Sequence, residues 1–327
     1  MLTRRHRRRR RHDWTGDAIE DAIAHGMSDH ALEQAIPEHS RRHRRWWRRV
    51  LWLLVALLLA FLAWGFVWEP AQLVERDYTL ALPRWPARCD GLRVDVVADL
   101  HTGSPRNGLD KLDHVVRRLE ASDSDAVLLA GDYVILKVLL GRYVAPEVVA
   151  AHLAPLAARK PVYAVLGNHD WWKDGSKVRR ALESAGIVVL QNQARELDLR
   201  GCHFWLVGVG DLWEGHPDVG GSFTQVRDDA PVIALTHNPE IFPRMPARAS
   251  LVIAGHTHGG QVWLLPGRPS MRGHHYLAGP IVEGGRHLFV SPGIGTSILP
   301  FRFRVPPEIS RLTLRIAAAG PIPSSPP

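Results

Sequence analysis

The longest hydrophobic segment of the chain is at residues 50–68, where 19 consecutive residues carry no charge. A helix of about 20 apolar residues crosses the hydrocarbon core of a bilayer. Trp46 and Trp47 precede this segment, and Trp64 and Trp68 lie at its far end, where tryptophan rings favour the headgroup region. A buried core helix would carry a polar stripe, and this segment has none. The pattern therefore predicts a transmembrane anchor.

Beyond the anchor, short apolar runs alternate with helical patterns. Five runs between residues 92 and 255 have the length of buried strands, and helical periodicity appears at 109–121, 146–158 and 176–185. This alternation predicts α/β architecture. Because ligands bind beyond the carboxyl ends of strands in open α/β sheets, five runs ending at one edge would build one site.

Each of the five runs ends in side chains that can bind a metal ion. Asp99 and His101 follow the first run, Asp132 the second, Asn168, His169 and Asp170 the third, His237 the fourth, and His256 and His258 the fifth. One such residue after a strand is usually a cap or a turn, so the interpretation rests on all five runs together. His256 and His258 are two residues apart, which places their imidazoles on the same side of an extended segment.

The chemistry of these ligands indicates two metal ions. Imidazole mixed with oxygen ligands suits Mn, Fe, Zn or Co better than Ca or Mg alone. Two divalent cations are offset by Asp99, Asp132 and a bridging hydroxide, which leaves a site of about one positive charge that favours an anionic phosphate. The sequence contains no glycine-lysine phosphate loop of the Walker type.

The net charge of +8 belongs mainly to the N-terminal segment. Residues 1–49 hold 13 arginines and 7 carboxylates, which leaves 28 basic and 26 acidic residues for the rest of the chain. A nearly neutral remainder gives no electrostatic argument for nucleic acid as the main partner. The arginines predict a disordered arm on anionic lipid, with a nucleic-acid-binding arm as the alternative. A short helix is expected around residues 16–25.

Six arginines between residues 41 and 49 directly precede the anchor, whereas the flank after it has mixed charges. The positive-inside rule then places the N-terminus in the cytoplasm and the large domain outside it. A cleaved signal peptide and twin-arginine export are alternatives. The run is longer than an ordinary signal core and no clean Ala-x-Ala site follows it, so we expect an uncleaved, single-pass anchor.

Cys89 and Cys202 are the two cysteines of the chain. Two cysteines are too few for a disulfide scaffold or a cysteine metal site. A bridge between them is one alternative if the domain is exported, and two unpaired thiols are the other. Cys202 is expected in a hairpin turn between strands at 196–199 and 203–209.

The ordered motifs Asp99-x-His101, Gly131-Asp132, Gly167-Asn168-His169-Asp170, His237 and Gly255-His256-x-His258 resemble those of the calcineurin-like metallophosphoesterases. Longer strings such as GHTHGGQVWLLPG and LTHNPE resemble the bacterial membrane-associated branch, the YaeI/YkuE-type phosphodiesterases. The resemblance covers about residues 90–316. It implies a two-sheet β-sandwich flanked by helices on both outer faces.

The resemblance also implies a role for each candidate residue. Asp99, His101 and His258 would hold one metal ion, Asn168, His237 and His256 the other, and Asp132 both. His169 would be the catalytic histidine that contacts the substrate. An imidazole beside a ligand can protonate a leaving alkoxide near neutral pH, which supports the same role.

One departure from the family pattern concerns His169. Several relatives carry an aspartate that orients this histidine three residues after Gly-Asp, where this chain has Ile135. Asp170 and Asp211 are the substitute candidates. Trp171 and Trp172 either wall the substrate pocket or pack in the core, Gln261 is a candidate substrate contact, and His274 and His275 are expected to be ordinary surface residues.

The sequence thus predicts a membrane-anchored phosphoric ester hydrolase, a phosphodiesterase or phosphomonoesterase, that uses a metal-bridging hydroxide. The alternative is a membrane-tethered binding protein on a degenerate phosphatase fold, which would have no reason to keep a full ligand set. The expected organisation is an Arg-rich, largely disordered arm at 1–49, the anchor at 50–68, a linker and first strand at 69–89, the catalytic domain at 90–316 and a disordered tail at 317–327.

Overall fold

The computed structural model of the 327-residue chain describes residues 38–263 and 273–317. The chain divides into two compact units, residues 1–61 and 62–327. The arm up to residue 37, with the helix expected around 16–25, and the tail from 318 onward lie outside the described residues.

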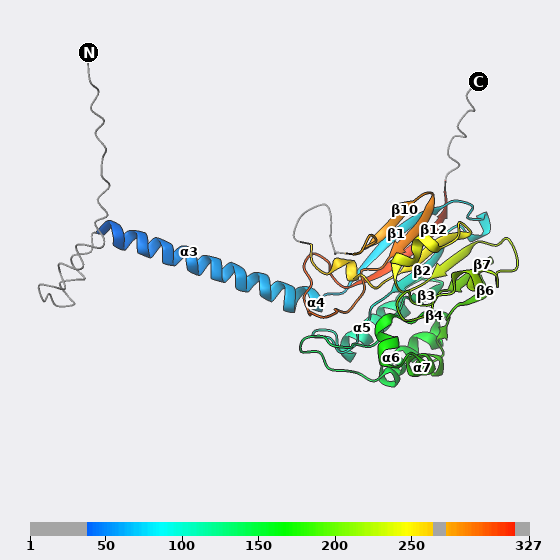
Figure 1. Cartoon of the computed structure of the whole chain (residues 1–327), viewed down its shortest axis with the longest axis horizontal. Helices are drawn as coiled ribbons and strands as arrows, with labels where there is room; N and C mark the ends of the chain where they lie inside the picture. The colour runs from blue at the N-terminus through cyan, green and yellow to red at the C-terminus, as the bar shows by residue number, and fades with distance from the viewer. Residues whose placement is uncertain (1–37, 264–272, 318–327) are drawn as a thin grey trace, which may run out of the picture. The chain divides into compact units, whose positions relative to one another are not determined.

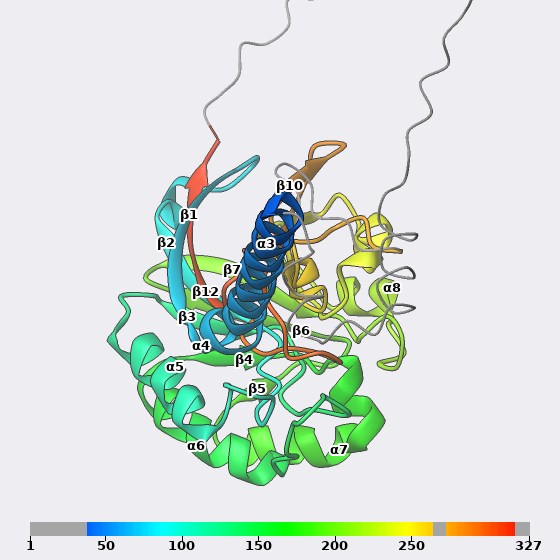
Figure 2. The same cartoon turned by 90° about the vertical axis from the view of Figure 1, so that its left-hand side faces the viewer.

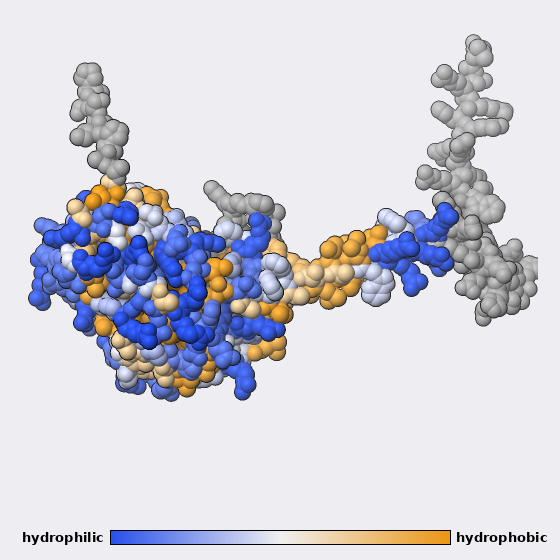
Figure 3. Space-filling view, turned by 180° about the vertical axis from the view of Figure 1, so that it is seen from behind, coloured by the Kyte–Doolittle hydropathy of each residue, from blue (hydrophilic) through white to orange (hydrophobic). Residues whose placement is uncertain are grey.

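The apolar segment is helical, as predicted. Helix α3 spans Glu38–Ala63, so residues 38–49 of the expected disordered arm are helical instead. A π-helical stretch, η1 (Trp64–Trp68), and the short helix α4 (Glu69–Ala71) follow. Residues Arg42–Ala71 are long and apolar enough to cross a membrane. Figure 3 shows a hydrophobic stretch on α3 and a hydrophilic end where its arginines gather.

Two six-stranded mixed sheets form the larger unit (Figure 1). The first sheet has the strand order β1-β12-β2-β3-β4-β5 and the second β10-β11-β9-β8-β7-β6. The first contains β1 (Val74–Leu82), β2 (Leu92–Val97), β3 (Ala126–Leu129), β4 (Val162–Ala164), β5 (Val188–Val189) and β12 (Glu308–Ile316). The second contains β6 (Gln193–Leu199), β7 (Cys202–Gly208), β8 (Val232–Leu235), β9 (Ala249–Ala254), β10 (Gly279–Glu283) and β11 (Arg286–Val290).

Helices flank both sheets. Among the described residues of the larger unit, the α-helices beyond α4 are α5 (Leu109–Ala121), α6 (Pro146–Arg159), α7 (Asn168–Ser184) and α8 (Val219–Phe223). The short 3₁₀ helices are η2 (Ala87–Cys89), η3 (Pro239–Arg244) and η4 (His258–Gly260). Figure 2 shows α5, α6 and α7 together on one side of the unit. Helix α7 is kinked at Asp174, whose backbone is not helical, so the helix expected at 176–185 is the part of α7 after the kink, which ends at Ser184.

Alternation along the strands divides the core into layers. In β2, Val94 and Val96 face the core shared by both sheets, whereas Val97 faces α5–α7. On the outer face of the second sheet, Val207 packs in a third cluster with Phe242 of η3. The two-sheet sandwich with helices on both outer faces is therefore confirmed.

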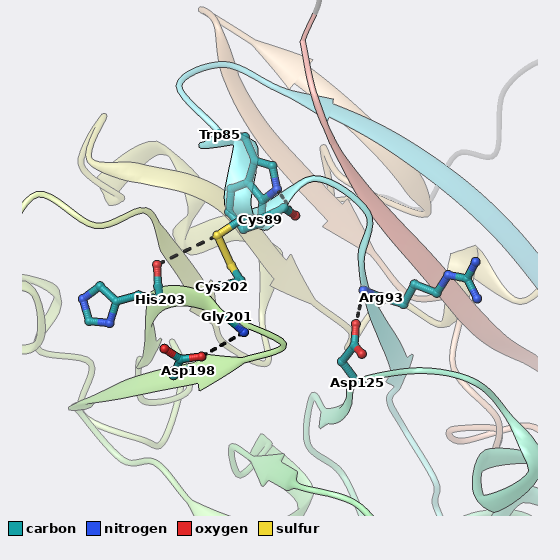
Figure 4. The surroundings of a disulfide bond; sticks show 8 residues. All are labelled: Trp85, Cys89, Arg93, Asp125, Asp198, Gly201, Cys202 and His203. Atoms are coloured by element: carbon teal, nitrogen blue, oxygen red, sulfur yellow. Dashed lines mark hydrogen bonds between the residues drawn. A yellow bond between two sulfur atoms is a disulfide. The ribbon is translucent and has the colours of Figure 1, made fainter.

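A disulfide joins Cys89 and Cys202, 113 residues apart in the chain (Figure 4). It links η2, which connects β1 and β2 of the first sheet along the chain, to β7 of the second sheet. Of the two alternatives that the sequence left open, the structure has the bridge. Cys202 was expected in the hairpin turn. It is instead the first residue of β7 and lies opposite Leu199.

The five runs predicted as strands are β2, β3, β4, β8 and β9. The alternation alone suggested that all five end at the edge of one sheet. The structure instead divides them between two sheets, with β2–β4 in the first and β8–β9 in the second. The strands within each group are parallel, so each group presents the residues that follow its strands at one end of its own sheet.

Candidate metal centre

The residues that follow these five strands converge. Three groups of these side chains place possible ligand atoms within 4.8 Å of one another. The groups are Asp99, His101 and His258; His101, Asp132 and His169; and Asp132, His237 and His256. Each of these residues was selected from the sequence, so the structure brings the predicted candidates together. Asn168 joins the last group, because its Oδ1 lies 3.2 Å from His237 Nε2.

The first half of the site is built around two imidazoles. His101 Nε2 lies 3.1 Å from His258 Nε2, and the rings are stacked. His258 Nε2 lies 3.6 Å from Asp99 Oδ1. Asp99 also accepts hydrogen bonds from the backbone N–H of His256 at 3.0 and 3.1 Å, which orients its carboxylate.

The second half of the site is built around His237. Its Nε2 lies 3.2 Å from His256 Nδ1 and 3.2 Å from Asn168 Oδ1. Asp132 lies between the halves, since its Oδ2 is 3.4 Å from His101 Nε2 and 3.3 Å from His237 Nε2. One carboxylate oxygen therefore faces both groups.

Three of the histidines share one orientation, which fixes their tautomers. The Nδ1 atoms of His101, His237 and His258 lie 3.2, 2.7 and 3.3 Å from backbone carbonyl oxygens of Val134, Ala130 and Gly295. A carbonyl only accepts, so each Nδ1 carries a proton, and in the neutral ring each Nε2 presents a lone pair inward. Backbone partners of this kind commonly orient metal-binding histidines. The inward lone pairs and carboxylate oxygens face one another, and such a set fits cations.

The electrostatics agree with that fit. Burial lowers the pKa of His101 to about 3 and that of His258 well below its usual range, which keeps both rings neutral. Burial alone would also lower the pKa of His237, but Asp132 and Asp99 hold it well above the ordinary value. The oxygens around His237 thus favour positive charge, whereas burial raises the pKa of Asp99 to about 7. Neutral imidazoles with ionised carboxylates are the forms that bind metals, so a bound cation would favour the ionised form of Asp99.

The backbone is strained at the candidate ligands. Five of them have positive φ, a region that non-glycine residues seldom occupy. They are Asp99 (52°), His101 (38°), Asp132 (59°), His256 (72°) and His258 (52°). Strain of roughly 1–3 kcal/mol per residue persists where the surrounding fold imposes it, and it clusters at functional sites. The segment around His256 and His258 is consequently not extended. The prediction that both imidazoles lie on the same side assumed an extended segment, so this assumption was wrong.

One glycine shows how closely these loops approach. A Cβ on Gly167 would lie 2.2 Å from Asp132 Oδ1. Only glycine lets the loop before α7 pass against this carboxylate. The Gly-Asn-His-Asp motif therefore combines a close approach, a candidate ligand and the beginning of a helix.

Asp170 holds the loop after β3 and does not orient His169. Its carboxylate accepts hydrogen bonds from the backbone N–H groups of Asp132, Tyr133 and Gly167, each at 2.9 Å. Asp211, the other substitute candidate, accepts from the N–H groups of Trp213 and Glu214. Within the described part of the chain, His169 Nδ1 is buried without a hydrogen-bond partner.

His169 is half-buried beside the cluster, with its ring 4.6 Å from that of His101. It lines a cavity of about 510 Å³ that is also lined by Asp132, Asn168, His256 and His258. Burial lowers the pKa of His169, against the opposing effect of Asp132. The predicted catalytic histidine thus lies where the cluster meets solvent.

The remaining lining of the cavity separates the weaker predictions. Trp172 and Gln261 line the cavity, whereas Trp171 packs against the hydrophobic cluster between the first sheet and helices α5–α7. His274 also lines the cavity, with its ring 5.5 Å from that of His256, so its assignment as an ordinary surface residue was wrong. His275 is exposed and pairs with Glu240, as expected. Sequence reasoning also missed Lys137, Trp213, Ile298 and Leu299.

Comparisons with known proteins agree with this site. The chain matches the calcineurin-like phosphoesterase family over residues 92–260. It is 36% identical to phosphodiesterase YaeI of Escherichia coli over 200 residues, which cover 58% of this chain and 70% of that protein. It is 29% identical to the uncharacterized metallophosphoesterase YkuE of Bacillus subtilis over 253 residues, covering 76% and 87%. A transmembrane protein with a metallophosphoesterase domain from Danio rerio is 28% identical over 304 residues, covering 88% and 66%.

The match covers more than half of the chain and includes the strands that position the cluster. The chain belongs to the calcineurin-like phosphoesterase family and is a metal-dependent phosphoesterase. The transmembrane relatives and the apolar helix also indicate membrane association.

Proposed function

We propose that the chain is a two-metal phosphoric ester hydrolase. Asp99, His101 and His258 would hold one ion, Asn168, His237 and His256 the other, and Asp132 both. The observation that carries the proposal is the position of Asp132 Oδ2, within 3.4 Å of an imidazole Nε2 from each group. Manganese, iron, zinc and cobalt suit these mixed nitrogen and oxygen ligands.

Two bound ions would stabilise charge on the phosphoryl oxygens and lower the pKa of the water that attacks phosphorus. The protein's own groups do the remaining work. His169, at the solvent side of the cluster, donates a proton to the leaving oxygen. Trp172 and Gln261 border the substrate, and Lys137 adds a positive charge at the cavity edge. Asp170 keeps the loop of Asp132 in place.

A metal analysis combined with an activity screen tests this function. The purified full chain should contain about two transition-metal ions and hydrolyse mono- or diesters of phosphate. A chelator should abolish turnover, and readdition of manganese, iron, zinc or cobalt should restore it. Undiminished hydrolysis after complete metal removal would contradict the proposal.

We further propose that the catalytic unit lies outside the cytoplasm. The arginines before the span support this orientation by the positive-inside rule. The disulfide between Cys89 and Cys202 supports it independently, since disulfides persist in oxidising compartments. Protease added to intact spheroplasts should digest the catalytic unit. Digestion only in inverted vesicles would show the opposite orientation.

A further inference from the structure

Two loops beside the cavity expose an apolar surface, which we name the apolar rim. Its four residues are Leu139, Leu140, Ile298 and Leu299, with exposed fractions of 55%, 82%, 78% and 42%. The loops are joined directly: the N–H of Leu139 donates to the carbonyl of Ile298 at 3.0 Å. Residues far apart in the sequence therefore form one continuous surface.

The apolar rim leads into the candidate metal centre. Ile298 and Leu299 line the same cavity as Asp132 and His169. Lys137, two residues before Leu139, also lines this cavity and is exposed. A ligand in this cavity therefore meets metal-binding groups, a positive charge and an apolar surface.

The rim also lies next to the end of the apolar span. Phe301, two residues after Leu299, packs edge-on against the ring of Phe66 at 4.8 Å. The N–H of Arg302 donates to the carbonyl of Gly65 at 3.0 Å. A Cβ on Gly65 would lie 2.1 Å from the ring of Phe301, so glycine permits this approach. All these contacts lie within the unit of residues 62–327.

The most exposed side chains of the rim are held by strained backbone. Leu140 and Ile298 both have φ of 61°. A positive φ is a genuine outlier for a β-branched residue such as isoleucine. Side chains this exposed contribute little burial, so core packing does not account for their being apolar. Exposed apolar surface beside a polar site commonly marks a place that binds lipid, ligand or protein.

We infer that the substrate is an amphiphilic phosphoester resident in the bilayer, whose apolar tail lies on the apolar rim while its phosphate enters the cavity. The inference rests on the proposed phosphoesterase function. Membrane lipid is the chosen occupant because the rim is continuous, through Phe301, with the last residues of the span. Lys137 complements the negative charge of the phosphate.

Two esters that differ only in their tails test the substrate class. Methyl 4-nitrophenyl phosphate and hexadecyl 4-nitrophenyl phosphate would be offered to the full chain in neutral detergent micelles, with nitrophenolate release as the readout. We expect kcat/KM for the hexadecyl ester to exceed that for the methyl ester by about tenfold or more. A ratio near one would overturn the inference. If the protein hydrolyses neither ester, both the inference and the proposed activity on phosphodiesters would be overturned.

The double variant Leu140→Asn/Ile298→Asn tests whether the apolar rim causes the preference for the hexadecyl ester. Asparagine tolerates positive φ, so the substitutions relieve strain and should not impair folding. The hexadecyl-to-methyl ratio should fall by about tenfold. The control Val282→Asn changes an equally apolar residue, 63% exposed on β10 and outside the cavity lining, and should keep the wild-type ratio. An undiminished ratio in the double variant would contradict the role of the rim.

A binding measurement separates this inference from catalysis. Both native cysteines are in the disulfide, so Leu140→Cys offers a single thiol for a polarity-sensitive dye. In the full chain reconstituted into phosphatidylglycerol and phosphatidylethanolamine vesicles, this dye should show blue-shifted emission and be quenched by brominated lipid. A dye at Val282→Cys should report water. Equal emission and quenching at both positions would overturn the lipid assignment even if the protein hydrolyses phosphate esters.

Discussion

The carboxylate of Asp132 accepts a hydrogen bond from the backbone N–H of His169 at 2.9 Å. This bond occupies Oδ1, so Oδ2 is the oxygen that faces His101 and His237. The backbone of the proposed acid thus orients the proposed bridging ligand. The side chain of His169 takes no part in this bond, so the two functions can be separated by mutation.

His169→Asn should leave the metal content unchanged, because the backbone N–H that orients Asp132 remains. Turnover of alkyl phosphate esters should fall by about 10²–10⁴-fold, the usual contribution of a general acid. Nitrophenyl esters should lose much less, since nitrophenolate departs with little help from a proton. Steady-state kinetics on both ester types checks this.

His275→Asn is the matched control, because His275 is exposed and pairs with Glu240 outside the cavity lining. It should behave as wild type on both esters. Equal losses on both esters in His169→Asn would mean that this residue binds the phosphoryl oxygens instead. Loss of metal would make it a ligand.

Asp170→Asn should destabilise the protein. The carboxylate accepts from the N–H groups of Asp132, Tyr133 and Gly167 in a buried site, and an amide cannot replace both oxygens as acceptors. A cost of roughly 2–4 kcal/mol is expected in the free energy of unfolding. Urea unfolding of the full chain in detergent measures it. Asp123→Asn, which alters an exposed pair with Arg93, should cost about 0–1 kcal/mol. Equal costs would refute the role given to Asp170.

Removing the disulfide should also destabilise the catalytic unit. Cys202→Ala opens a link across 113 residues between the two sheets, with an expected cost of roughly 2–5 kcal/mol. Thermal unfolding with and without reductant checks this. Reductant should lower the stability of the wild type and leave that of the variant unchanged. A wild type insensitive to reductant under unfolding conditions would indicate that the bridge does not form.

The sequence predicted those parts of the site that depend on local pattern. Asp99, Asp132 and His237 each directly follow a short apolar run, and that pattern alone identified the strands and their terminal residues. The two-sheet arrangement came from the family resemblance, because a hydrophobic run does not specify which sheet a strand joins. Local pattern also misjudged the backbone at His256 and His258, where positive φ replaces the extended conformation.

Features assembled by tertiary contacts were beyond sequence reasoning. His274 reaches the ring of His256 through a loop whose own pattern resembles ordinary surface. The apolar rim joins Leu139 to Ile298, and nothing local to either residue indicates the other. The orientation of Asp170 toward backbone N–H groups likewise depends on how the loop after β3 folds back onto α7.

The central claim is that Asp132 serves two metal ions, and the metal content of Asp132→Asn tests it most directly. An amide removes the negative charge that both groups of ligands share, while its size is nearly unchanged. Elemental analysis of the purified variant should show fewer metal ions per chain than the wild type, and its phosphoesterase activity should be lower by several orders of magnitude. Two bound ions together with full activity in Asp132→Asn would contradict the account.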